Sequence, residues 1–314
     1  MSAFLARQAK VGVIMATIPK WTEIPKYPVV VGFGALAVVV TIAWWAKVDI
    51  TPFFENAEIR RGQLWRLVTS ILPHLDILHL TFNLYWLWVL GTPVERTYGH
   101  GKTLLLFLFL AVGSNSLDFA FDRGGVGLSG VGYGLFGLLC VVSDRDERFR
   151  GAIDRRTVNL FIGWFVICII TTITHTFAVA NVAHGAGAVL GALVGFAITQ
   201  PSRRLLIGGT IAVIDIFGLW GATLGRPTIN LSGKVGFEEG KWGYDALLAD
   251  KNEEAARWLR DAARLQPKES SYWFDLGIAY HRMGNMPAAM AAYQRAHELD
   301  PNNQTYSQAV ENKH

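Results

Sequence analysis

The sequence predicts an all-α protein, in which a polytopic bundle of transmembrane helices precedes a small helical repeat domain. The 314 residues are 51% hydrophobic and only 17% charged, which is too apolar for an ordinary soluble chain of this length. The apolar residues form long runs instead of helical stripes or alternating strands. After residue 224 the composition becomes charged and rich in alanine. Intrinsic disorder, collagen and disulfide scaffolds are thereby excluded.

Seven stretches approach the ~20 residues that cross a hydrocarbon core. Six form the predicted core bundle and the last is a seventh helix. The fourth is short, so its neighbours must shield it or it must begin below the membrane surface. The seventh contains Asp215 and several glycines, and interfacial placement is its alternative. The predicted spans are residues 29–46, 72–90, 103–121, 129–142, 158–180, 181–199 and 205–224.

Basic residues flanking the spans predict the orientation. Residues 1–28 lack the apolar core and cleavage site of a secretory signal, so the first span is predicted to be an uncleaved anchor. Most Lys and Arg residues between the spans fall on the side of the N-terminus, which the positive-inside rule assigns to the cytoplasm. We expect a bacterial cytoplasmic membrane, with residues 47–70 in its outer interface and the repeat domain outside if the seventh span crosses.

Polar side chains at membrane depth cost a few kcal/mol when charged, so each is a functional candidate. In the second span His74, His79 and Asn83 interrupt an apolar run. The spacing of four between His79 and Asn83 places them on one helix face. The alternative interpretation is hydrogen bonding between helices, worth about 0.6–2 kcal/mol per contact.

A serine and a histidine form the most specific pattern. Ser129 opens the fourth span between Gly127 and Gly130, where free helix N–H groups favour a developing oxyanion. In the sixth span, small residues such as Gly187 form a ridge beneath His184. Close packing of the two helices predicts contact between a nucleophile and its base. The alternative is that His184 merely bonds a carbonyl group.

At these residues the chain resembles the rhomboid family of intramembrane serine proteases, over roughly residues 29–224. The resemblance implies a dyad of Ser129 and His184, with oxyanion binding by His79, Asn83 and the Ser129 N–H. It also implies a bundle that cleaves a transmembrane segment of another membrane protein near its outer end. The matching or supporting residues are Trp65, Arg66, His74, His79, Asn83, Glu95, Arg96, Gly127, Ser129, Gly130, Tyr133, His184, Gly187 and Gly191.

The resemblance also implies that Tyr133 packs against His184 and that the dyad needs no acidic third member. Asp76 and Asp118 are expected on the outer side, with no evident path to His184. Metalloprotease and aspartyl-protease spacings are absent from the sequence, so neither metal nor cofactor is expected. Cys140 and Cys168 lie in apolar runs and predict no disulfide. The basic balance follows the membrane flanks, so no nucleic-acid partner is expected.

The charged region after a boundary near residues 226–233 contains a repeat of thirty-four residues. Gly243 and Pro267 recur as Gly277 and Pro301. This spacing resembles the tetratricopeptide repeat, with glycine where two helices cross. We predict two repeats over residues 235–303, a tail over 304–314, and recruitment of a protein partner. The alternative is a small stabilising cap.

Two other classes of function compete with the protease. One is a catalytically silent rhomboid-like protein that binds membrane clients and uses the repeats as a scaffold. The presence of both Ser129 and His184 argues against it. The other is a transporter, which predicts inverted repeats and paired charges at mid-membrane, and the sequence shows neither.

Overall fold

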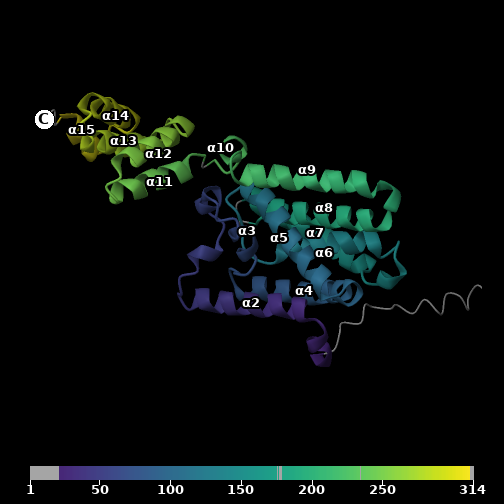
Figure 1. The fold of residues 1–314 in the computed structure, drawn as a ribbon. Coiled ribbons are helices and arrows are strands. Elements are labelled where there is room, and N and C mark those ends of the chain that lie inside the picture. Colours follow the sequence, from purple (N-terminus) through teal and green to yellow (C-terminus); the bar gives the residue numbers. More distant parts are fainter. Residues whose placement is uncertain (1–20, 175, 177–178, 234, 312–314) are drawn as a thin grey trace, which may run out of the picture. The chain divides into compact units, whose positions relative to one another are not determined.

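The computed structural model describes residues 21–174, 176, 179–233 and 235–311. The first twenty residues of the predicted cytoplasmic segment and residues 312–314 of the predicted tail lie outside the described residues. The chain divides into two compact units, with Arg226 ending the first and Pro227 beginning the second. The elements of the first unit are η1 (Trp21–Lys26), α2 (Pro28–Trp45), η2 (Thr51–Phe53), η3 (Ala57–Arg61), α3 (Arg66–Thr69), α4 (Ile77–Tyr98), α5 (His100–Phe121), α6 (Ser129–Val142), η4 (Glu147–Phe149), α7 (Arg155–Ile173), α8 (Asn181–Thr199), η5 (Pro201–Arg203) and α9 (Arg204–Ala222), as Figure 1 shows.

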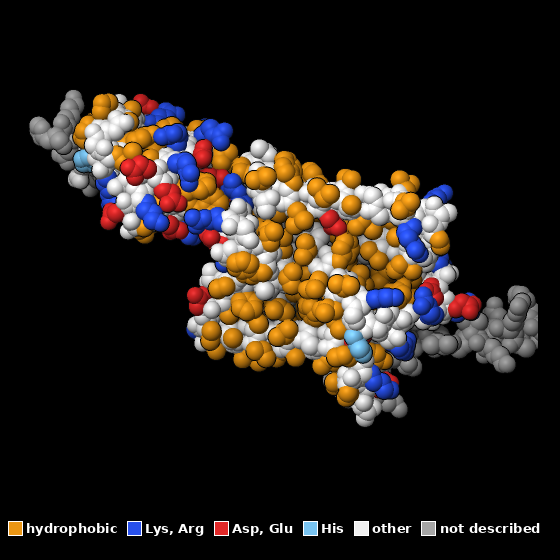
Figure 2. Space-filling view, viewed as in Figure 1, with side chains coloured by type: hydrophobic (Ala, Val, Ile, Leu, Met, Phe, Trp, Pro, Cys, Tyr) orange, Lys and Arg blue, Asp and Glu red, His pale blue; other side chains and the backbone are white. Residues whose placement is uncertain are grey.

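The first unit has the helices of an integral membrane protein. Five helical stretches of the described chain are long and apolar enough to cross a bilayer: α2, α5, α7, α8 and the stretch Pro201–Ala222 that contains α9. In Figure 2, hydrophobic side chains cover most of the visible surface of this unit, and most of its visible Lys and Arg lie along the right-hand edge and at the bottom. These findings confirm the prediction of an all-α transmembrane bundle.

The second span is the clearest correction to the predicted boundaries. It was expected at 72–90, whereas α4 runs from Ile77 to Tyr98. The Asp76 carboxylate accepts the N–H groups of Leu78 and His79, each at 2.9 Å, and so caps the helix start. Pro93 lies inside the helix instead of ending it. His74 consequently lies in the loop before the span, while α7 ends at Ile173, seven residues before the predicted 180.

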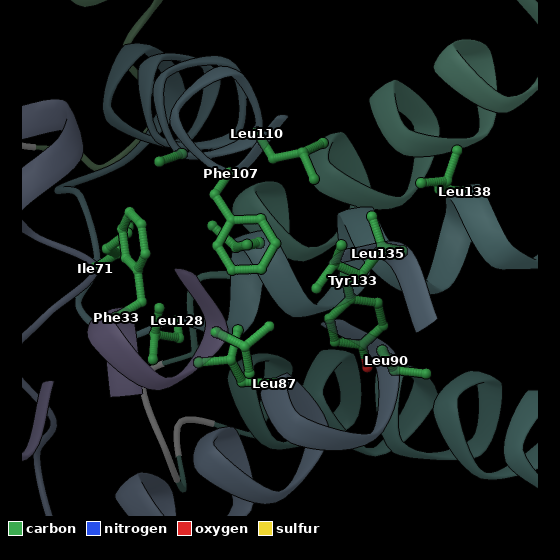
Figure 3. Close-up of a cluster of buried hydrophobic side chains, with 14 of the residues drawn as sticks. Phe33, Ile71, Leu87, Leu90, Phe107, Leu110, Leu128, Tyr133, Leu135 and Leu138 are labelled. Carbon is green, nitrogen blue, oxygen red and sulfur yellow. The ribbon is translucent and has the colours of Figure 1, made fainter. Parts of the chain in front are cut away.

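Side chains from α2, α4, α5 and α6 form the main hydrophobic core. Phe33 of α2, Leu87 and Leu90 of α4, Phe107 of α5 and Leu135 of α6 belong to one buried cluster (Figure 3). The rings of Phe33 and Phe107 meet edge to face, with centroids 5.4 Å apart. This core holds together the helices that carry the site described below.

Glu95 joins the first two long helices. Its carboxylate oxygens accept the N–H groups of Val29 and Val30 at the start of α2, each at 2.9 Å. The α2 N-terminus has no side-chain cap of its own. The Glu95 carboxylate therefore accepts from N–H groups that would otherwise be buried without an acceptor. His100 contacts the same carboxylate at 2.7 Å.

The segment 47–70 is more buried than the predicted interfacial loop. Arg66 is 5% exposed, and its guanidinium donates to the carbonyl groups of Thr51 at 2.7 Å and Phe54 at 3.0 Å. These bonds fix the fold of the loop. Leu64 and Trp65 remain exposed, so only part of the segment presents an apolar surface to the interface.

The second unit is built of short antiparallel helices. The Cβ positions of Gly243 and Gly277 meet Leu259 and Tyr293 respectively, so equivalent glycines permit helix crossing in both repeats. Residues 304–311, predicted to be a tail, form a further helix because the Tyr306 ring packs on Phe274 at 4.7 Å. The helices are α10 (Arg226–Ile229), α11 (Phe237–Leu248), α12 (Asn252–Leu265), α13 (Ser270–Arg282), α14 (Met286–Leu299) and α15 (Gln304–Glu311), of which α10 begins on the last residue of the first unit.

Candidate active site

Glycines allow α6 and α8 to pack backbone against backbone. A Cβ on Gly187 would overlap the carbonyl oxygen of Gly130, and a Cβ on Gly191 would overlap that of Gly134. No larger residue fits at these points unless the helices separate. The predicted ridge of α8 therefore lies directly on the first turns of α6, which begin with Ser129.

This packing brings Ser129 and His184 together. The Oγ of Ser129 lies 2.8 Å from Nε2 of His184, which is hydrogen-bond distance for a hydroxyl and an imidazole. His184 is only 5% exposed, whereas Ser129 is partly accessible. Among the described residues, Nδ1 of His184 has no hydrogen-bond partner. In the part of the chain that the structure describes, no carboxylate therefore orients this ring directly.

Tyr133 lies against one face of the His184 ring. The two rings stack with centroids 4.6 Å apart and an interplanar angle of 19°. The Tyr133 hydroxyl donates to the Phe161 carbonyl of α7 at 3.2 Å. Because one end of the tyrosine is bonded and its face contacts the imidazole, it restricts rotation of His184.

The loop before Ser129 is fixed by backbone hydrogen bonds. Gly127 N–H donates to the Ser70 carbonyl at 3.1 Å, and Leu128 N–H donates to Nε2 of His74 at 3.3 Å. His74 is fully buried, and burial lowers its pKa to about 4, with a smaller contribution from His79. Neutral His74 can therefore accept at Nε2 while its Nδ1 contacts the Leu72 carbonyl at 2.9 Å.

Gly127 is required by both conformation and space. Its φ is +104°, a region that disfavours residues with a Cβ. A Cβ there would lie 2.8 Å from Cε1 of His79 and 2.9 Å from its Nε2. The loop that leads to the serine thus passes directly against the His79 ring.

The structure places His79 and Asn83 differently from one another. Nδ2 of Asn83 donates to the His79 carbonyl at 2.9 Å, within their own helix. The His79 ring packs edge to face on His74, with centroids 4.9 Å apart. Within the described residues, neither His79 nor Asn83 makes a hydrogen bond to Ser129, although His79 borders the loop before it.

The length of α6 determines the depth of the serine. Its 14 residues span about 21 Å at ~1.5 Å per residue, against a hydrocarbon core of about 30 Å. One end of α6 must therefore lie inside the thickness that longer neighbours cross. Since Ser129 is the first residue of α6, it lies below the membrane surface if the recessed end is the N-terminus.

Sequence reasoning missed two acids near this site. Oδ1 of Asp118 accepts the N–H of Ala183 at 3.1 Å, immediately before His184, where no path had been expected. Oε2 of Glu55 accepts the N–H of Gly125 at 2.9 Å. An acid within a membrane helix was the available signal for Asp118, whereas nothing distinguished Glu55 from other loop acids. No cluster of His, Cys, Asp and Glu suited to a metal occurs among the residues the structure describes.

Comparison with known proteins identifies both parts of the chain. Residues 61–201 match the rhomboid domain family, and residues 270–303 match the tetratricopeptide repeat family. The rhomboid protease GluP of Bacillus subtilis (strain 168) is 28% identical over 260 residues, covering 79% of this chain and 48% of that protein. The rhomboid protease GlpG of Serratia proteamaculans (strain 568) is 35% identical over 175 residues, covering 54% of this chain and 62% of that protein.

The matches with these two relatives span about half to three fifths of each relative's length. The rhomboid domain match includes both Ser129 and His184. Since the rhomboid match lies within the transmembrane bundle and the repeat match within the helical pairs, the chain carries a rhomboid domain and a C-terminal tetratricopeptide repeat.

Proposed function

We propose that this chain is an intramembrane serine endopeptidase that cleaves transmembrane segments of other membrane proteins. The observation that carries the proposal is the separation of 2.8 Å between Ser129 Oγ and His184 Nε2. A buried imidazole touching a partly accessible hydroxyl is the arrangement that activates a serine nucleophile. The rhomboid domain match and the names of the relatives support the same chemistry.

In the proposed reaction, His184 accepts the Ser129 proton as Oγ bonds to the scissile carbonyl carbon. His184 then gives that proton to the leaving amine as the peptide bond breaks, which leaves an acyl group on Ser129. A water molecule then loses a proton to His184 and adds to the acyl carbon. The bond from this carbon to Oγ breaks as His184 returns the proton to Ser129, and the new C-terminus leaves. Tyr133 keeps the imidazole facing Ser129 through all of these proton transfers.

The developing oxyanion needs donors near the start of α6. The first N–H groups of a helix have no partner within it, and those of Ser129 and its successors belong to this class. We propose that His79 and Asn83 add side-chain donors. Asn83 uses one amide hydrogen on the His79 carbonyl, so its second hydrogen can serve a bound substrate. Loss of one such donor costs ~10²–10³ in turnover in soluble serine proteases.

The decisive test is cleavage of a fluorogenic transmembrane reporter by purified protein in proteoliposomes. Ser129→Ala and His184→Ala should abolish cleavage, whereas Ser143→Ala, at the opposite end of α6, should leave it intact. Retained cleavage by Ser129→Ala would reject this nucleophile. No cleavage by wild type, with binding of membrane segments retained, would favour the silent scaffold instead.

We further propose that the repeat unit recruits substrates or partners outside the cytoplasm, with the N-terminus inside. A groove of about 400 Å³ in this unit is lined by Phe237, Gly240, Lys241, Tyr244, Glu269, Ser271, Tyr272 and Asp275. Tyr244 is half exposed, and Leu248 of the same helix is also exposed but lies outside the groove. These two residues therefore form a matched pair for substitution.

Recruitment predicts that Tyr244→Ala and deletion of 237–314 reduce shedding of full-length membrane proteins from cells, while cleavage of the bare reporter is unchanged. Leu248→Ala should alter neither. Equal effects of the deletion on both substrates would indicate a stabilising cap. A fusion reporter at His314 that is active only in the cytoplasm would overturn the proposed orientation.

A further inference from the structure

Two buried acids converge on the glycine segment that precedes the serine. Glu55 is 8% and Asp118 1% exposed, yet they come from an outer loop and from α5. The Cβ position of Gly124 overlaps the Glu55 carboxylate, and that of Gly125 lies 3.5 Å from Oδ2 of Asp118. Burial of carboxyl groups is costly unless they make specific hydrogen bonds.

Each acid makes such a bond to one half of the site. Glu55 accepts the Gly125 N–H at 2.9 Å and the Ser70 hydroxyl at 3.3 Å. Ser70 in turn accepts from Asn115 at 2.9 Å, and its carbonyl accepts the Gly127 N–H at 3.1 Å. This network holds the loop at two points within four residues of Ser129.

Asp118 bonds to the start of α8, the helix that carries His184. The N-terminus of α8 has no side-chain cap from its own sequence. The Asp118 carboxylate accepts the Ala183 N–H at 3.1 Å, so α5 supplies the missing cap and a charge that suits the helix dipole. Since Ala183 is bonded directly to His184, the cap fixes the turn that carries the imidazole.

The charge of Asp118 also acts on Glu55. Burial, and next the charge of Asp118, raise the pKa of Glu55 well above its ordinary value, while Arg226 acts in the opposite direction. Arg226 is itself 7% exposed, and its guanidinium lies 3.6 Å from the centre of the Phe119 ring. The two acids are thus buried neighbours and not surface groups.

We propose that Glu55 and Asp118 are positioning residues that together set the alignment of the dyad. Glu55 fixes the loop that delivers Ser129, and Asp118 fixes the first turn of the helix that delivers His184. The role rests on the proposed serine protease activity. Neither acid exchanges a proton with substrate, because each acts through a backbone N–H group.

The test compares isosteric and truncated variants by the cleavage rate of the transmembrane reporter per folded molecule. Asp118→Asn and Glu55→Gln keep the acceptor oxygen and should stay within about threefold of wild type. Asp118→Ala and Glu55→Ala lose it and should lower kcat at least tenfold with KM little changed, since a displacement of about 1 Å can cost ~10². The rate at which a fluorophosphonate labels Ser129 should fall in parallel.

Glu95→Gln is the matched control, because Glu95 is another buried acid that serves a helix N-terminus, at the far end of α4 from His79. It should lower thermal stability without lowering kcat per folded molecule. Unchanged kcat in both alanine variants would overturn the inference, as would equal losses in the amide and alanine variants. Inactive wild type, or active Ser129→Ala, would instead reject the proposed function.

Discussion

Replacing Gly187 with alanine tests whether backbone contact between α6 and α8 sets the dyad. The new Cβ would overlap the Gly130 carbonyl oxygen, and would lie 3.1 Å from the Gly130 carbonyl carbon and 3.3 Å from the Gly134 amide nitrogen. All three are backbone atoms, so no side-chain rotation relieves the clash. Because ordinary contacts of this kind begin near 3.4 Å, the helices must separate by roughly 1 Å.

That displacement would move Ser129 and His184 apart. Gly130 follows Ser129 directly, and Gly187 lies about one turn from His184. Lengthening the present 2.8 Å separation of Oγ and Nε2 by the same amount removes the hydrogen bond. We expect cleavage to fall ~10²-fold. Overpacking of this kind costs about 1–3 kcal/mol, which leaves most of the protein folded.

The assay is cleavage of the transmembrane reporter in proteoliposomes, together with the thermal midpoint of each variant. Gly163→Ala is the matched control, because a Cβ on this α7 glycine meets no atom within 4 Å. It should match wild type in both measurements. Wild-type cleavage by Gly187→Ala would refute the dependence of the dyad on this contact.

Three further changes probe other parts of the bundle. Tyr133→Phe keeps the ring stacked on His184 and should retain most cleavage, whereas Tyr133→Leu should lose at least tenfold in reporter assays. Glu95→Gln should destabilise the bundle by about 1–3 kcal/mol in chemical unfolding, because the acceptors of the Val29 and Val30 N–H groups are weakened. The folded-state pKa of His74, about 4, lies below its ordinary value, so its contribution to stability is present above pH ~6.5 and lost as pH falls toward 4. Thermal midpoints measured from pH 7 to 4 should decline less in His74→Asn, and an identical decline would contradict this assignment.

Most of the fold could be predicted from hydropathy and from the spacing of glycines. Each of the seven predicted spans overlaps a helix of the described chain, and five helical stretches are long and apolar enough to cross a bilayer, because the bilayer requires continuous hydrophobic stretches. The start of α4 was misjudged because apolar residues before Asp76 belong to a buried loop. Composition cannot separate a buried loop from a span when both exclude water.

Contacts between segments far apart in the sequence were harder to predict. The spacing of Gly187 and Gly191 indicated a smooth face on α8, and the structure packs this face on Gly130 and Gly134. The link from Asp118 to Ala183 joins residues 65 positions apart, and no local periodicity encodes it. Pairing of a side chain with a backbone N–H depends on tertiary packing, so it leaves no pattern in one sequence.

The course of α9 returns the chain to the end of the bundle that carries Ser129 and His184. The α8 helix starts at the dyad and runs away from it, and α9 returns along α5, where Gly218 lies against the Ser116 side chain. Beyond its end, Arg226 donates to the Asp122 carbonyl at 2.8 Å, which begins the loop leading to Ser129. This bond ties the segment after α9 to the loop whose last residues position Ser129. A change at Arg226 should therefore disturb the serine loop even though Arg226 lies 97 positions from Ser129 in the sequence, which again shows that the site depends on contacts between distant segments.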